Sequence, residues 1–244
     1  MPLLIKHKDE RELGTVPSSL SLLICAATSW ETHPIADVLG LAPNRSDSFS
    51  GTVNGVAVFL LKTGIGETSL QRSLETIPQG IKFSRIISTG FCGGLKSNID
   101  SGDIVCDFGS VHPDATEQCR QIAIEKAKVH FGSLAHSSIV LASSDLKKSL
   151  AKNSASLAVD METAPLRVWA KEKFPAAEVW GIRAVLDALE DRLPSGMPPK
   201  ENLLSQIFYA LSHPMDWPLF LKIYFKQKKA SETLTQFLSQ LIGK

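Results

Sequence analysis

Short apolar runs alternate with polar stretches along the first half of the chain. The run at 21–27 ends in small residues and is typical of a buried strand. Thr28-Ser29 offers a helix N-cap, and Pro34 suits the start of a helix that reaches about Leu39. Two apolar runs over 49–62 flank Asn54-Gly55, which is the strongest short signal for a β-hairpin. The pattern therefore predicts a strand, a helix and a hairpin in succession.

Glycine-rich segments follow the hairpin and the next apolar strand. Residues 63–68 are punctuated by glycine and open a helix, and the strand expected at 84–89 runs into the glycine-rich segment 90–95. Further strands are expected at 102–107, 139–142, 156–159 and 179–185, and a helix at 163–174 before Pro175. Strands that alternate with helices indicate an α/β fold with a largely parallel sheet covered on both faces.

The two ends of the chain differ from this pattern. Residues 1–18 are polar, without the apolar core of a signal peptide, and we expect an N-terminal arm there. Residues 203–244 carry no strand signal, and helical stretches are expected there, broken at His213-Pro214 and Trp217-Pro218. The sequence thus predicts an α/β domain over 19–202 with a C-terminal helical extension packed on or beside it.

Composition narrows the class of protein. The 244 residues are 43% hydrophobic and 21% charged, values that suit one folded domain and exclude a disordered chain. The formal net charge is +1, so no bulk field attracts nucleic acid. The four cysteines form no C-x-x-C pair, which favours reduced thiols in a cytoplasmic protein. The six histidines show no ligand spacing, so no metal site is expected.

Carboxylates and glycines stand where the expected strands end. Glu31, Glu162 and Asp187 each follow an apolar strand, as do the glycine segments 64–66 and 90–94. Ligands of open α/β sheets bind at the carboxyl ends of strands, so these residues predict a site for a polar small molecule. The residues alone leave ordinary roles open: Glu31 as a solvated first-turn residue, Asp187 as a helix N-cap, and the glycines as turns.

Five motifs in order give the chain a resemblance to a known family. They lie at 26–31 (AATSWE), 62–66 (KTGIG), 89–95 (TGFCGGL) with 102–105 (GDIV), 159–162 (VDME) and 182–187 (IRAVLD). The chain resembles the nucleoside phosphorylase and nucleosidase superfamily, in particular its methylthioadenosine/S-adenosylhomocysteine nucleosidases. The resemblance implies a three-layer α/β fold over 19–202, with a mixed, mostly parallel central sheet flanked by helices.

The resemblance also implies roles for particular residues. Asp187 would be the acid that protonates N7 of the base, and Glu31 would activate the attacking water. Glu162 would accept hydrogen bonds from the ribose hydroxyls, with Met161 packed against the sugar. The other residues expected to bind the base or line the site are Ala27, Gly66, Phe91, Cys92, Gly93, Val140, Asp160 and Leu186. No cofactor and no metal are implied.

Water and phosphate are the two nucleophiles that this superfamily uses. Ser88 and Phe91 stand where the phosphorylase branch typically carries an arginine and a serine, and a carboxylate at Glu31 would repel phosphate. Arg85 is close in sequence, but strand alternation alone does not place it. We therefore expect hydrolysis, with phosphorolysis and futalosine cleavage as alternatives. A non-catalytic nucleoside-binding protein is the alternative from another class.

The substrate expected from the resemblance is a 5′-modified, adenosine-like nucleoside. Residues 136–141 contain no aromatic where the family often stacks a Phe on adenine, and Leu186 replaces a small polar residue. A closer resemblance, in 90–94, 159–162 and 191–194, is to the hopanoid-associated phosphorylases. That resemblance makes an adenosylhopane the candidate substrate.

The resemblance and the C-terminal sequence each predict a partner. Family members are commonly dimers, so the resemblance implies a homodimer. Residues 213–229 mix large apolar side chains with four lysines, a composition that suits peripheral contact with a membrane. The alternative is a helix packed on the domain with a solvated lysine face.

Overall fold

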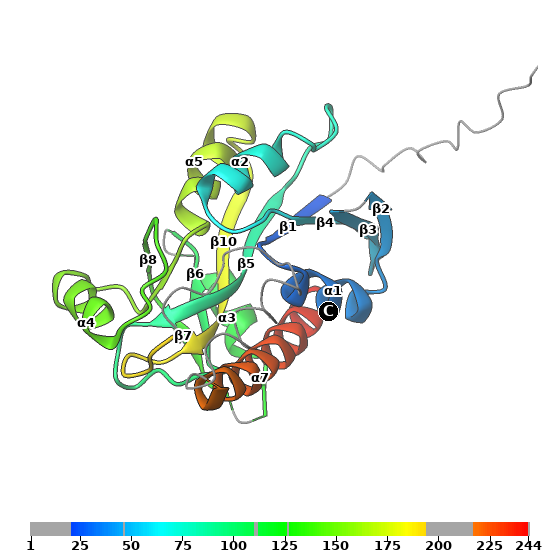
Figure 1. Cartoon of the computed structure of the whole chain (residues 1–244). Coiled ribbons are helices and arrows are strands. Elements are labelled where there is room, and N and C mark those ends of the chain that lie inside the picture. The colour runs from blue at the N-terminus through cyan, green and yellow to red at the C-terminus, as the bar shows by residue number, and fades with distance from the viewer. Residues whose placement is uncertain (1–20, 46, 110–111, 126, 194–216, 244) are drawn as a thin grey trace, which may run out of the picture.

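The computed structural model describes residues 21–45, 47–109, 112–125, 127–193 and 217–243 (Figure 1). The strands are β1 (Ser21–Ala26), β2 (Ala42–Arg45), β3 (Ser48–Val53), β4 (Val56–Lys62), β5 (Arg85–Gly94), β6 (Ile104–Asp107), β7 (Val129–Phe131), β8 (Leu134–His136), β9 (Ala158–Asp160) and β10 (Glu178–Asp187). The helices are α1 (Ser29–Leu39), α2 (Glu67–Leu74), α3 (Pro113–Arg120), α4 (Ser144–Asn153), α5 (Thr163–Lys173) and α7 (Trp217–Ile242).

These strands form one mixed sheet. Its order is β2-β3-β4-β1-β5-β10-β6-β7, with β9 paired to β5 and β8 to β9. The central strands β4, β1, β5 and β10 are parallel, whereas β2, β3 and β6 join antiparallel neighbours. The expected α/β fold with a mixed, mostly parallel centre is confirmed. The carboxyl ends of β1, β5 and β10 consequently meet at one edge.

The predicted hairpin is confirmed. Strands β3 and β4 pair antiparallel, with Val53 opposite Val56. The two turn residues have positive φ, 49° at Asn54 and 80° at Gly55. Asparagine and glycine tolerate this conformation best, which is why the sequence predicts the turn so clearly.

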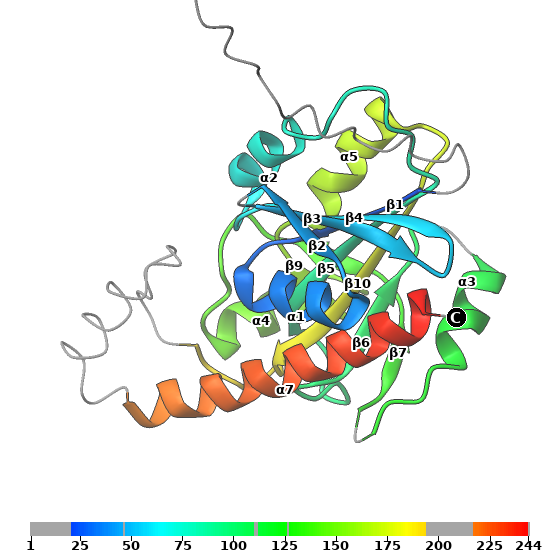
Figure 2. The ribbon, with the colours of Figure 1, turned by 90° about the vertical axis from the view of Figure 1, so that its right-hand side faces the viewer.

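Helices cover both faces of the sheet, as Figure 2 shows: α1 and α7 lie on one side and α2 and α5 on the other. Alternate side chains of a strand point to opposite faces. Accordingly Leu22 and Ile24 of β1 belong to the core under α1 and α7, whereas Leu23 and Cys25 belong to the core under α2 and α5. The first apolar run is buried on both faces, as its composition predicts.

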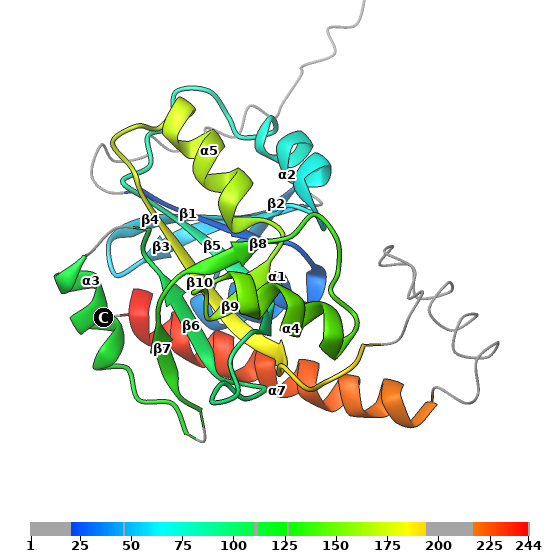
Figure 3. The ribbon, with the colours of Figure 1, turned by 90° about the vertical axis from the view of Figure 1, so that its left-hand side faces the viewer.

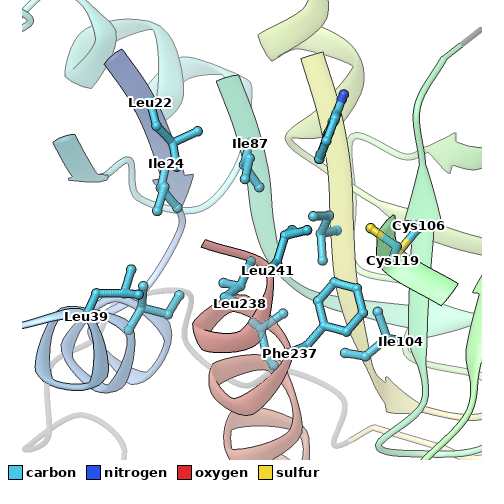
Figure 4. Close-up of a cluster of buried hydrophobic side chains, with 14 of the residues drawn as sticks. Leu22, Ile24, Leu39, Ile87, Ile104, Cys106, Cys119, Phe237, Leu238 and Leu241 are labelled. Atoms are coloured by element: carbon cyan, nitrogen blue, oxygen red, sulfur yellow. The ribbon is translucent and has the colours of Figure 1, made fainter. Parts of the chain in front are cut away.

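Helix α7 is a structural part of the domain. Phe237, Leu238 and Leu241 are buried in the same core as Leu22 and Ile87, and Figure 4 shows them directed at the sheet. Pro218 stands in the first turn of α7, where a proline is tolerated because the helix needs no donor there. Within the described ranges, no helix is both long and apolar enough to cross a membrane.

Some expectations about the termini fall outside the described residues. These are the arm at 1–18, the domain boundary at 202/203 and the break at His213-Pro214. They stay predictions.

The strand expected at 139–142 is wrong. These residues form an irregular loop, in which Ile139 is 61% and Val140 56% exposed. An apolar run predicts a strand when it can be buried in a sheet, and this run lies beside a cavity instead. The sheet is extended nearby by β8 and by β9, which starts two residues later than the expected 156–159. Figure 3 shows α4 beside these two strands.

Candidate active site

A cavity of about 210 Å³ opens at the edge where β1, β5 and β10 end. Apart from Gly66, every residue that the sequence singled out as a site residue lines it. These residues are Ala27, Glu31, Phe91, Cys92, Gly93, Val140, Asp160, Met161, Glu162, Leu186 and Asp187. Segments far apart in sequence thus meet in one place, as expected for strand ends of an open sheet.

Glu31 holds its carboxylate inside the protein. It is the third residue of α1, and its Oε2 accepts hydrogen bonds from the N–H (2.6 Å) and the hydroxyl (2.9 Å) of Thr28. Its Oε1 accepts from the N–H of Phe91 at 2.8 Å. The side chain caps the helix in the manner of a capping box and also faces the cavity. The interpretation as a solvated residue is wrong, because Glu31 is only 3% exposed.

Burial sets the protonation of Glu31. Removal from water raises the pKa of its carboxyl, the Arg183 guanidinium opposes this rise, and the Glu162 carboxylate adds to it. The net pKa lies above the ordinary value for a glutamate. A carboxylate with a raised pKa is a better proton acceptor at neutral pH, which suits a general base.

Arg183 organises the carboxylates beneath the cavity. This buried residue of β10 places Nη2 2.7 Å from Asp160 Oδ2 and Nη1 3.5 Å from Glu162 Oε2. It also donates to the Ser88 hydroxyl (2.7 Å) and the Thr89 carbonyl (2.9 Å). Burial alone would lower the pKa of this guanidinium, but the neighbouring carboxylates outweigh burial and raise it. Arg183 therefore stays a cation.

Glu162 connects two of the predicted motifs. It lies at the N-cap of α5, and its Oε1 accepts the N–H of Gly66 at 3.1 Å. Gly66 therefore does not line the cavity itself but contacts the lining residue Glu162 through its N–H. Burial raises the pKa of the Glu162 carboxyl, against the effect of Arg183. Met161 lies beside it, and a Cβ on Gly66 would be 3.8 Å from Met161 Cε.

Asp187 is paired with a lysine that the motifs did not reveal. Its Oδ2 lies 2.6 Å from Nζ of Lys147, and both side chains are buried. Burial raises the pKa of the Asp187 carboxyl, the positive charge of Lys147 opposes the rise, and the net pKa is above the ordinary value. The interpretation of Asp187 as a plain helix N-cap is wrong, since it ends β10 and lines the cavity.

Comparison with known proteins agrees with the fold and the motifs. Residues 21–106 match the family profile described as the Phosphorylase superfamily. The resemblance to the phosphorylase superfamily is confirmed. The 5′-methylthioadenosine/S-adenosylhomocysteine nucleosidase of Actinobacillus succinogenes is 37% identical over 103 residues, which are 42% of this chain and 41% of that protein. The homologous segment thus spans about two fifths of that relative's length.

Solved structures extend the likeness of the fold over most of the chain. The Neisseria meningitidis 5′-methylthioadenosine/S-adenosylhomocysteine nucleosidase, in complex with methylthio-immucillin-A, has a TM-score of 0.68 at 16% identity. It covers 91% of this chain and 98% of its own. The futalosine hydrolase of Helicobacter pylori has a TM-score of 0.65 at 14% identity, covering 91% and 97%.

The positions of Ser88 and Arg85 bear on whether the cavity could hold phosphate. Ser88, which stands where phosphorylases of the superfamily typically carry an arginine, faces Arg183 and the Thr163 hydroxyl. Arg85 lies at the opposite end of β5 from Gly93, stacked 3.6 Å from the ring centroid of Trp180. Among the described residues that line the cavity, Lys147 is the only lysine or arginine. In the described ranges, no group of three or more His, Cys, Asp or Glu side chains could hold a metal ion.

Sequence reasoning missed two functional candidates. Arg183 stands in an otherwise apolar strand run, and a charged residue buried there must be paired. The sequence therefore does indicate that Arg183 has carboxylate partners. Lys147 gave no such signal. It is followed by Lys148 and by a further lysine at 152 in a polar helix, and the sequence does not show which of them is buried.

Proposed function

We propose that this protein is a nucleosidase, an enzyme that uses water to hydrolyse the N-glycosidic bond of a purine nucleoside. One observation carries the proposal: a single cavity gathers buried carboxylates in three different settings. Asp187 is paired with Lys147, Glu31 accepts N–H and hydroxyl donors, and Glu162 is held by Gly66 and Arg183. Different settings give carboxylates different tasks.

Hydrolysis of the N-glycosidic bond needs a proton donor beside the purine and a proton acceptor beside the attacking water. As the bond between C1′ and N9 breaks, its electron pair passes to the purine and Asp187 gives its proton to N7. The sugar becomes oxocarbenium-like, water attacks C1′, and Glu31 accepts the proton that the water loses. Burial raises the pKa of both carboxyls above their ordinary values, the direction that favours holding or accepting a proton. Proton transfer from Glu31 back to Asp187 through solvent restores the enzyme.

The sugar is held at the acidic centre of the site. A carboxylate accepts hydrogen bonds from two neighbouring hydroxyls, so Glu162 suits the 2′ and 3′ positions of ribose. Met161 lies next to it and offers an apolar surface to the ring. Gly66 fixes the Glu162 carboxylate from behind through its N–H.

The charges favour water over phosphate. Four carboxylates line the cavity, those of Glu31, Asp160, Glu162 and Asp187. The described lining contains one cation, Lys147, and this cation is already paired with Asp187. A phosphate dianion placed there would meet carboxylates, and the described lining residues offer it no lysine or arginine other than Lys147. Phosphorolysis is the second candidate, because the superfamily resemblance is shared with phosphorylases.

The finer proposal concerns the nucleoside. A 5′-modified adenosine-like substrate suits the apolar part of the lining, formed by Ile65, Ile139, Val140, Leu186 and Leu193. The relative from Actinobacillus succinogenes carries the name of a nucleosidase for methylthioadenosine and S-adenosylhomocysteine. Adenosylhopane is proposed from the hopanoid-associated resemblance, and futalosine is the alternative that the Helicobacter pylori structure suggests.

Assembly and location are proposals as well. We propose a cytoplasmic homodimer that contacts membranes peripherally. On α7, Leu221, Tyr224 and Phe225 are exposed, whereas Lys226 turns inward to Asp191. Flotation with anionic liposomes tests the membrane contact, and recovery of all protein in the soluble fraction would overturn it. Analytical ultracentrifugation tests the dimer, and a sedimenting monomer at working concentrations would overturn that.

A substrate panel with and without phosphate tests the function. The panel holds methylthioadenosine, S-adenosylhomocysteine, adenosine, inosine, futalosine and an adenosylated polyprenoid, and the free base is measured. The expected result is base release that does not depend on phosphate. Turnover that requires phosphate would make the enzyme a phosphorylase, and nucleoside binding without any base release would make it a binding protein.

A further inference from the structure

Lys147 is a fully buried cation outside every motif that relates the chain to its superfamily. It lies in the first turn of α4, which the Ser143 hydroxyl caps by accepting the N–H of Leu146 at 3.2 Å. The side chain has no exposed surface, yet it contributes to the cavity lining. A buried ammonium group is very costly without partners, so the position demands an explanation.

Both partners of Lys147 belong to the end of β10. Nζ donates to Oδ2 of Asp187 at 2.6 Å and also to the carbonyl oxygen of Ala188. Oδ1 of Asp187 has no hydrogen-bond partner among the described residues, and Asp187 lines the cavity. The lysine therefore occupies one carboxyl oxygen and leaves the other for a ligand.

We infer that Lys147 is the positioning residue that makes Asp187 an effective acid toward the leaving base. This inference rests on the proposed nucleosidase function. Lys147 fixes the carboxyl through Oδ2, so the proton on Oδ1 faces the purine. When that proton moves to N7, the carboxylate left behind sits against a positive charge already in place. Lys147 keeps all its protons throughout, and the electron pair of the glycosidic bond goes to the purine.

The other charges around the pair do not replace Lys147. Asp191, on the loop after β10, and Lys226, on α7, both influence Asp187, but they form an ion pair with each other. Glu190 lies near Lys147, is exposed and pairs with Lys148 at 2.5 Å. On β5, the thiol of Cys92 feels the Asp187 charge, and burial raises its pKa so that it stays neutral. Lys147 is thus the cation in direct contact with Asp187.

The test compares two leaving groups in Lys147→Met. A purine nucleoside needs protonation to leave, whereas p-nitrophenyl riboside does not. We expect kcat/KM for the purine nucleoside to fall by about 10²–10⁴, the usual contribution of a general acid, while hydrolysis of the p-nitrophenyl riboside stays near wild type. The high-pH limb of the purine profile should move to higher pH, because loss of the cation raises the pKa of Asp187 further.

Three further variants separate the proposed role of Lys147 from a structural one. Lys147→Arg retains the charge and should retain most of the purine activity. In the double variant Lys147→Met with Asp187→Asn, no charge is left unpaired, so folding is preserved, and the lysine change should cost nothing beyond Asp187→Asn alone. Lys148→Met, at the exposed neighbour, is the matched control and should behave as wild type.

Each outcome is informative. Equal losses of activity on both substrates, with an unshifted pH profile, would show that Lys147 is merely structural. The same conclusion would follow if adding Lys147→Met to Asp187→Asn lowered activity as much as Lys147→Met lowers it in the wild type. Unchanged purine turnover in Lys147→Met would also overturn the inference. Failure of the proposed function is separate, since then the wild type itself would release no base from any purine nucleoside.

Discussion

A Cβ atom on Gly90 would lie 2.3 Å from Oε1 of Glu31 and 2.9 Å from Nη1 of Arg183. The backbone of β5 therefore approaches closely both Arg183 and Glu31, the base of the proposed reaction. Gly90 also has a φ of +132°, a conformation that side chains disfavour. The glycine of the strand-end motif is required by close approach and by backbone conformation together.

Replacing Gly90 with alanine is expected to abolish the proposed nucleosidase activity. The methyl group would displace Glu31, and a shift of about 1 Å at a reacting group costs roughly 10²-fold in rate. Base release by Gly90→Ala measures this loss, and thermal unfolding should show a destabilisation of about 1–3 kcal/mol from the strained φ.

Gly80→Ala is the matched control for strain. Gly80 also has a positive φ, +86°, but a Cβ there meets no atom within 4 Å. This variant should lose some stability and keep its activity. If Gly90→Ala loses no more activity than Gly80→Ala, the close approach of Gly90 to Glu31 does not matter for base release.

Glu31→Gln separates the two roles of that side chain. Glutamine also serves at the third position of a capping box, so α1 should keep its N-terminal cap. It cannot accept a proton, and base release should fall by about 10²–10⁴. Glu67→Gln, in the exposed first turn of α2, is the control and should leave activity unchanged. A fully active, stable Glu31→Gln would rule out the role of Glu31 as the base.

The Asp107–Arg167 pair should make stability depend on pH. Oδ2 of Asp107 accepts hydrogen bonds from Nη1 of Arg167 at 3.0 Å and from the N–H of Leu134 at 2.8 Å. Burial alone would raise the pKa of Asp107, but these hydrogen bonds outweigh it and the net pKa is lowered. The stabilisation is then present above the unfolded-state value of about 3.9 and is lost as the pH falls through the folded-state value.

Urea denaturation of Arg167→Met checks this sign. The variant should be less stable than wild type by about 1–3 kcal/mol at neutral pH, because the buried Asp107 carboxylate loses the arginine and keeps only backbone donors. The difference should shrink as the pH falls below the unfolded-state value of about 3.9 and through the lowered folded-state pKa of Asp107, because the carboxyl is then protonated in both proteins. A difference that stays constant or grows toward acid would contradict the assignment.

Helix α7 should be essential for stability. Phe237 is fully buried between the helix and the sheet. Phe237→Ala is expected to cost about 3–5 kcal/mol, the usual loss for a buried phenylalanine. Phe225→Ala, on the exposed face of the same helix, is the control and should change the free energy of unfolding little. Similar effects of the two changes would show that α7 is not packed as described.

The sequence predicts much of the site because parallel strands bring their ends together. Glu31 follows β1 and Asp187 ends β10, and the edge where these parallel strands end is enough to place them together. Glu162 follows β9, which pairs antiparallel with the end of β5, so the rule for parallel strands does not place it. Asn54-Gly55 is predictable for a local reason, since two residues determine that turn. Local signals of this kind need no knowledge of the rest of the fold.

The remaining features depend on tertiary contacts. Lys147 and Lys148 are neighbours in one polar helix, yet one is buried against Asp187 and the other pairs with Glu190 at the surface. The run 139–142 has the composition of a strand but borders a cavity. No local pattern distinguishes these cases, because burial is decided by segments distant in the chain.

The account depends most directly on Asp187 as the acid in hydrolysis. Asp187→Asn keeps the shape of the side chain and removes its proton-donating carboxyl. Free purine released in phosphate-free buffer is the measurement, with Asp145→Asn in the exposed first turn of α4 as the control. We predict base release by the wild type and the control, and a loss of about 10²–10⁴ in folded Asp187→Asn. Turnover by Asp187→Asn equal to that of the wild type would contradict the account.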